Sequence, residues 1–188
     1  YEGVSAGHNV SLSPDGKMAL LGNFSQQIIL LNITKPENMQ VIARQATQYI
    51  EECPYRLRSN THHLWYPDNE HFIGVIGDHL YRFHIDRLRE PEQLGPHHLL
   101  NAHEIRWDQN RRYILIADLG PEDADARQIA VFDLEEPDSA KRSKVIKLPG
   151  TVWHCCVHPE RPVGYAPTYT FATEQEDYVD WAPDYMRE

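Results

Sequence analysis

Short apolar strands separated by polar turns recur along this chain. Residues 8–23 align without a gap with residues 103–118, and each segment leads from an alternating stretch through a polar turn into an apolar run. This order is typical of a strand, a tight turn and a second strand. Similar segments begin near residues 61 and 153. The pattern therefore predicts a strand-turn-strand unit that occurs four times.

Each unit continues with further strands. Apolar runs at 18–22, 73–76 and 114–117 are predicted to be buried second strands, and third strands are expected at 27–33, 79–86 and 128–134. Fourth strands are expected at 41–44 and 144–148. Four short strands per unit form the blade of a β-propeller. A β-sandwich is the alternative all-β fold, but it does not predict the same four-part order in successive units.

The predicted blades cover most of the chain. The shared turn position falls at residues 14, 67, 109 and 159, and known blade repeats are about 40–50 residues long. We expect blades at about 8–46, 62–100 and 103–148, and a partial fourth from 153 to 164. Residues 165–188 are aromatic and acidic, and this segment is expected to be an exposed loop, a lid or an interface.

Residues 29–38 (ILLNITKPEN) and 131–138 (VFDLEEPD) resemble the ends of third strands in the LVIVD and YVTN classes of bacterial propeller repeats. The resemblance implies an all-β propeller, whose members usually close with six to eight blades. It therefore implies either that the chain is a fragment of a larger ring or that the ring has four blades. A repeat-class resemblance says little about chemistry.

Charge and hydropathy narrow the range of partners. The net charge is −10, and the 18 basic residues are scattered, so we expect no nucleic-acid surface. Apolar runs fall far short of about 18 residues, so no membrane span is expected. Cys53, Cys155 and Cys156 do not predict a disulfide framework, although one bridge from Cys53 stays open. Nothing in the sequence assigns a compartment.

Histidines gather at the predicted blade starts. The first position of the inner strands holds His8, Thr61, His103 and Trp153, and the next holds Asn9, His62, Glu104 and His154. Because inner strands converge on the axis of a propeller, residues far apart in sequence are expected to meet at one mouth of the channel. The predicted ligands of a divalent Mn, Fe, Zn or Cu ion are His62, Glu104 and His154, with His8 and His103 as alternates.

A second candidate shell consists of His8, His63 and His103, because a register slip of one residue moves a side chain to the other face of a sheet. The competing interpretation is that these histidines pack and form separate hydrogen bonds between blades. If an acid or base acts near the axis, the expected residues are His63, Glu104 and Arg106.

Residues 61–68 (THHLWYPD) are similar to a Thr-His-Glu-Phe-Trp-x-Pro-Asp stretch of oligogalacturonate lyases. These are seven-bladed propellers that hold a divalent metal with axial side chains. The similarity implies a ligand role for His62 alone, because His63 stands where that family has Glu.

Two functions are therefore expected. The first is a metal-dependent enzyme of the lyase or oxygenase class that acts on a small polar or sugar-acid substrate at the channel mouth. The second is a non-catalytic propeller that serves as a binding platform for a protein partner. The expected partners are a small-molecule substrate, a protein, or further blades of the same ring.

Overall fold

The computed structural model describes residues 7–23, 27–46, 62–76, 79–94, 102–108, 110–118, 128–134, 141–148, 150–161 and 163–169. In these residues the chain forms three complete four-stranded antiparallel blades and a partial fourth. Blade 1 consists of β1 (Gly7–Leu12), β2 (Met18–Asn23), β3 (Gln27–Asn32) and β4 (Gln40–Ala46), with a short 3-10 turn η1 (Pro36–Asn38) before β4. Blade 2 consists of β5 (His63–Trp65), β6 (His71–Ile76), β7 (His79–His84) and β8 (Glu92–Gln93). Blade 3 consists of β9 (Ala102–Trp107), β10 (Tyr113–Asp118), β11 (Gln128–Asp133) and β12 (Lys141–Lys147).

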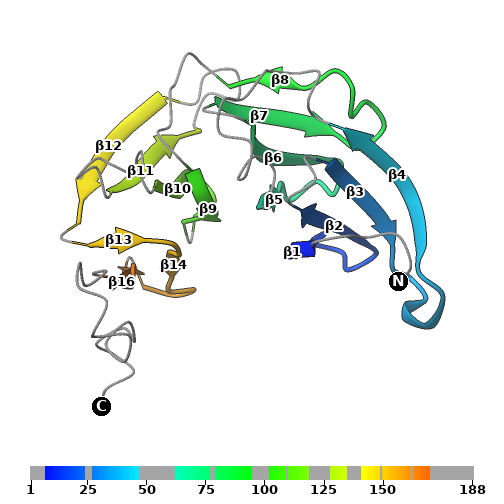
Figure 1. Ribbon diagram of the computed structural model, residues 1–188, viewed down its shortest axis with the longest axis horizontal. Helices are drawn as coiled ribbons and strands as arrows, with labels where there is room; N and C mark the ends of the chain where they lie inside the picture. The colour runs from blue at the N-terminus through cyan, green and yellow to red at the C-terminus, as the bar shows by residue number, and fades with distance from the viewer. Residues whose placement is uncertain are drawn as a thin grey trace, which may run out of the picture.

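The blades stand side by side along an arc. In each complete blade the strands follow chain order from the inside outward, so β1, β5 and β9 lie nearest the centre of the arc in Figure 1. The outermost strands β4, β8 and β12 form the rim. This confirms the predicted propeller class and excludes the sandwich alternative.

The fourth blade is a hairpin with an interruption. Strand β13 (Thr151–Val152) pairs with β16 (Thr168–Tyr169), and β14 (Cys156–Val157) pairs with β15 (Gly164–Tyr165). Residues 153–155 lie between the two paired parts and belong to no strand. Strands therefore continue to residue 169, beyond the expected boundary at 164. The remainder of the aromatic and acidic segment, and Cys53, lie outside the described residues.

The turn between the first and second strands is the same in all three complete blades. Gly16, Asn69 and Arg111 occupy one position of this turn and have φ angles of 70°, 62° and 56°. Glycine adopts this left-handed conformation freely, and Asn tolerates it better than most residues do. In blade 1 the Asp15 carboxylate closes the turn by accepting from the Ser13 hydroxyl at 2.7 Å. The three complete blades therefore share the turn between the first and second strands that the repeat in the sequence predicted.

Three apolar clusters of the arc each lie between two neighbouring blades, and a fourth lies within blade 1. Leu20 and Leu30 of blade 1 share a cluster with Phe72 and Phe83 of blade 2. A second cluster joins blade 2 to blade 3, and a third joins blade 3 to the fourth blade. The predicted second strands at 18–22, 73–76 and 114–117 supply buried residues to these clusters, as expected.

Two tryptophans at the same strand position bind the preceding blade. The Trp65 indole donates a hydrogen bond of 3.1 Å to the carbonyl of Ser11 in blade 1. The Trp107 indole donates one of 2.8 Å to the carbonyl of Trp65. The prediction that both residues pack between blades is confirmed, and the contacts fix neighbouring inner strands relative to each other. No helix in the described part of the chain is long and apolar enough to cross a membrane.

Candidate functional site

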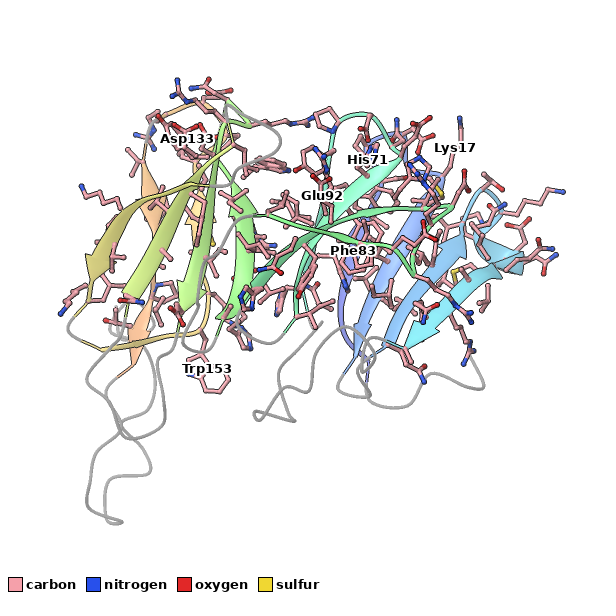
Figure 2. All side chains as sticks on the ribbon, turned by 90° about the horizontal axis from the view of Figure 1, so that it is seen from above. Lys17, His71, Phe83, Glu92, Asp133 and Trp153 are labelled. Atoms are coloured by element: carbon pink, nitrogen blue, oxygen red, sulfur yellow. The ribbon has the colours of Figure 1, made fainter. Side chains whose placement is uncertain are left out.

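The starts of the inner strands lie on one face of the arc. The turns between the first and second strands lie on the other face. Figure 2 shows Trp153 on the face opposite Lys17, His71 and Asp133. The fold therefore separates the polar residues at the blade starts from the histidines of the turns.

Polar side chains from successive blades form a continuous row at this face. The Asn9 amide nitrogen of blade 1 lies 2.5 Å from Nδ1 of His62 in blade 2. The ring centroids of His62 and His103 are 4.9 Å apart, and those of His103 and His154 are 5.4 Å apart. We call Asn9, His62, His103 and His154 the axial row. Side chains from four different blade starts are therefore neighbours in this row.

Trp153 contacts the axial row through His103. Its ring packs edge-on against His103, with centroids 5.0 Å apart and an interplanar angle of 76°. Neither Trp153 nor Asn9 was among the predicted site residues. Both stand in the aligned columns that also contain the predicted histidines, so the repeat register was the signal that could have identified them.

Glu104 is the centre of a buried polar cluster behind the row. Only 3% of its side chain is exposed, and one carboxylate oxygen is ion-paired with Arg106. The other oxygen accepts from the backbone N–H of Cys155 at 3.0 Å and from His154 Nδ1 at 2.9 Å. These donors compensate for the burial of the carboxylate. Cys155 and His154 both lie in the interruption of the inner strand at 153–155.

The contact with Glu104 determines the orientation of His154. An ionised carboxylate only accepts hydrogen bonds, so the proton on Nδ1 of His154 points toward Glu104 and Nε2 of the neutral ring is an acceptor. The His154 side chain is 46% exposed, in contrast to its partner. His154 therefore presents a basic nitrogen outside a buried, oriented pair.

His63 does not belong to the mouth. It is 2% exposed, and its ring packs edge-on against Phe72 at 5.5 Å. Its Cδ2 lies 3.2 Å from the position of a Cβ on Gly74, and Nε2 has no hydrogen-bond partner. Burial lowers the pKa of His63 to about 4. The expectation that His63 acts as an acid or base at the mouth is not supported, because the side chain is enclosed between blades.

The described residues do not assemble the predicted metal centre. No group of three or more His, Cys, Asp or Glu side chains within the described ranges is placed to hold a metal ion. His154 contacts Glu104, but His62 lies beside His103, and both Glu104 oxygens already have donors. The side chain of His8 lies outside the described ones. Metal binding stays a prediction, and no step below depends on it.

A thiol nucleophile is also unsupported at this site. Burial, followed by the nearby Glu104 charge, raises the pKa of Cys155 to about 12. The thiol is therefore neutral at physiological pH, and nucleophilic attack requires the thiolate.

A cavity of about 330 Å³ lies away from the axial row. It is formed by residues 43–45 of β4 and by residues 85–90, which follow β7. Because β4 is the outermost strand of blade 1, this cavity lies at the rim of the arc. No residue of the axial row lines it.

No family model matches the sequence, and no curated protein matches it. Solved structures of similar fold were found. A candidate 6-phosphogluconolactonase from Bacteroides uniformis ATCC 8492 is 14% identical with a TM-score of 0.64, covering 94% of this chain and 52% of that chain. Hydrazine synthase from Kuenenia stuttgartiensis is 14% identical with a TM-score of 0.67, covering 92% and 46%.

A candidate 6-phosphogluconolactonase from Bacteroides fragilis NCTC 9343 is 13% identical with a TM-score of 0.62, covering 86% of this chain and 47% of that chain. At such identities the likeness establishes the propeller-type fold and not the activity. No match supports the finer assignment to LVIVD or YVTN repeats. The chain spans about half the length of these solved structures.

Proposed function

We propose that the face carrying the axial row is the active site of an enzyme that acts on a sugar acid or its lactone. In this proposal His154 is the general base and Glu104 is the positioning residue. The observation that carries it is the buried Glu104 carboxylate 2.9 Å from Nδ1 of the half-exposed His154. A carboxylate that holds the imidazole in one tautomer is the arrangement that makes the other nitrogen an effective base.

The reaction that fits this pair is hydrolysis of a lactone. Nε2 of His154 takes a proton from water while the water oxygen attacks the lactone carbonyl carbon. The resulting tetrahedral intermediate collapses, the ring carbon-oxygen bond breaks, and the leaving oxygen takes the proton back from the imidazolium. Glu104 stabilises the transient imidazolium through its contact with Nδ1.

Arg106 is the residue we propose for binding an anionic group of the substrate. Its guanidinium is ion-paired with Glu104 and donates to the Ile105 carbonyl at 3.2 Å, yet 41% of the side chain is exposed. A guanidinium has five donors in a planar fork, so donors remain for a carboxylate or phosphate oxygen. Two of the solved structures of similar fold are candidate 6-phosphogluconolactonases, which agrees with a sugar-acid substrate.

The same base could remove a proton next to a carboxylate, as a lyase requires. The metal-dependent lyase or oxygenase expected from the sequence also needs a metal centre, which the described side chains do not form. We therefore favour lactone hydrolysis, which His154 can catalyse without a metal.

The test is acid release from a panel of aldonolactones, measured at constant pH and corrected for the spontaneous reaction. We expect His154→Ala to lower kcat/KM by about 100-fold or more. Glu104→Gln should lower kcat more than KM, because the amide no longer favours the proton on Nδ1. His71→Ala is the matched control, since it removes an imidazole from the opposite face.

Full activity of His154→Ala would overturn the proposal. Absence of turnover with every lactone, together with tight binding of a protein partner, would instead favour the non-catalytic platform.

A further inference from the structure

The cavity of about 330 Å³ at the rim lies between blade 1 and blade 2. Residues 43–45 of β4 form one wall, and residues 85–90, which follow β7, form the other. The ends of β4 and β7 lie side by side in Figure 1. Pockets for small molecules in proteins measure about 300–1,000 Å³, so this cavity has the size of a site for a small ligand.

The wall from blade 2 is held in place by its own main chain. The Arg87 N–H donates to the His84 carbonyl at 3.0 Å, and the Glu90 N–H donates to the Arg87 carbonyl at 3.0 Å. Residues 84–90 therefore form two successive turns. Leu88 of the second turn is 7% exposed and belongs to the apolar cluster that blades 1 and 2 share. The shape of this wall is therefore fixed before any ligand binds.

The cavity combines an apolar surface with charges of both signs. Ala43 and Ile85 are partly buried against the same cluster as Leu88, and all three residues line the cavity. The remaining residues of the wall from blade 2 are charged and exposed, namely Asp86, Arg87, Arg89 and Glu90. A ligand in this cavity therefore meets an apolar surface, two guanidinium groups and two carboxylates.

Arg89 joins the two walls. Its Nε donates a hydrogen bond of 3.0 Å to the side-chain oxygen of Gln45 in β4. A guanidinium has five donors, so Arg89 keeps donors for a carboxylate while it holds Gln45. Arg44 also lines the cavity, but it pairs with Ile29, whereas Gln45 pairs with Ile28. Because successive strand residues point to opposite faces, the Arg44 guanidinium points away from blade 2 and adds no charge to this site.

We propose that this cavity binds a small zwitterion with an apolar side chain, that is, a free α-amino acid such as leucine. Arg89, with Arg87 beside it, binds the carboxylate, and Asp86 and Glu90 accept from the ammonium group. The apolar side chain lies on Leu88. Two guanidiniums and two carboxylates balance, so the charges of the cavity complement a zwitterion better than an anion. The proposal concerns the rim and does not rest on the reaction proposed for the axial row.

An NMR titration followed at the methyl signals of Ile85 and Leu88 tests the proposal with four compounds. Leucine carries both charges, N-acetylleucine lacks the ammonium group, leucinamide lacks the carboxylate, and glycine lacks the apolar side chain. We expect leucine to bind at low salt with a Kd of about 1 mM, because the charges are exposed. Each of the other compounds should bind at least about tenfold more weakly. Equal affinity for leucine and N-acetylleucine would overturn the proposal, as would the absence of saturable leucine binding up to about 10 mM.

Two substitutions separate the two charges of the ligand. Arg89→Gln should lower the affinity for leucine by about tenfold and leave that for leucinamide unchanged. Glu90→Gln should lower the affinity for leucine and leave that for N-acetylleucine unchanged. Arg161→Gln is the matched control, because Arg161 is an exposed arginine of the fourth blade, outside the cavity. An affinity for leucine that neither Arg89→Gln nor Glu90→Gln changes would overturn the proposal.

Discussion

Replacing His63 should remove a large part of the acid sensitivity of the fold. Burial lowers the pKa of His63 from 6.5 to about 4, because the ring is enclosed by Phe72 and Gly74 between blades 1 and 2. In the unfolded chain the imidazole takes up a proton as the pH falls below 6.5. In the folded chain it stays neutral until about pH 4. The contribution of His63 to stability is therefore present above pH 6.5 and is lost as the pH falls through this window.

The size of the loss follows from the shift. One unit of pKa difference corresponds to about 1.4 kcal/mol, so the free energy of unfolding should fall by about 3 kcal/mol between pH 6.5 and pH 4 because of His63 alone. The variant His63→Leu has no group to titrate at this position. Its unfolding free energy should therefore be less sensitive to pH by that amount.

The assay is urea unfolding followed by tryptophan fluorescence at half-unit steps from pH 7.5 to pH 4. Other groups titrate in this range, so the informative quantity is the difference between the unmodified chain and His63→Leu at each pH. Leu64→Ala is the matched control, because it removes packing at the next residue and leaves the imidazole in place. A constant difference between the unmodified chain and His63→Leu across this range would refute the reasoning.

Three further changes probe the blade contacts, the cluster around Glu104 and the turns. Trp65→Ala should destabilise the fold by about 3–5 kcal/mol in urea unfolding, because the side chain is buried between blades and its indole N–H is hydrogen-bonded there. A loss below about 1 kcal/mol would contradict that packing role. Glu104→Ala should cost about 3–5 kcal/mol in the same assay, since it leaves Arg106 and the Cys155 N–H without their carboxylate; equal stability would show that the cluster is not formed. Gly16→Ala should cost about 1 kcal/mol through its φ of 70° alone, because a Cβ there has nothing within 4 Å, and Gly16→Asn should cost less. Equal costs for these two variants would argue against the left-handed turn.

The repeat made much of the fold predictable. Strand alternation and turn residues located the first and second strands because each blade repeats the same local pattern. In the structure Gly16, Asn69 and Arg111 share the left-handed position of the turn between these strands. The end of the fourth blade is harder to predict from sequence, because β15 and β16 are only two residues long each and carry little periodicity.

The repeat predicted which strand positions form the candidate site, but it did not predict the contacts between their side chains. Register predicted His62, His103 and His154 at one mouth, and in the structure the ring of His103 contacts those of His62 and His154. The sequence could not show that one Glu104 oxygen accepts from both His154 and the Cys155 N–H, since these donors lie where the fourth inner strand is interrupted. Nor could it separate His63 from His62, because adjacent strand residues point to opposite faces and the register relative to the neighbouring blade decides which one is enclosed.

The most direct test of the central claim is an NMR titration of the histidine ring carbon-hydrogen signals with a sugar acid such as gluconate. The signals of His62, His103 and His154 are assigned by single substitutions, and those of His71 and His84 serve as internal controls from the turn side of blade 2. The account predicts saturable shifts for His154 and its neighbours in the axial row and none for His71 and His84. Shifts confined to His71 and His84, or no saturable shift at His154, would contradict the assignment of the axial row as the binding site.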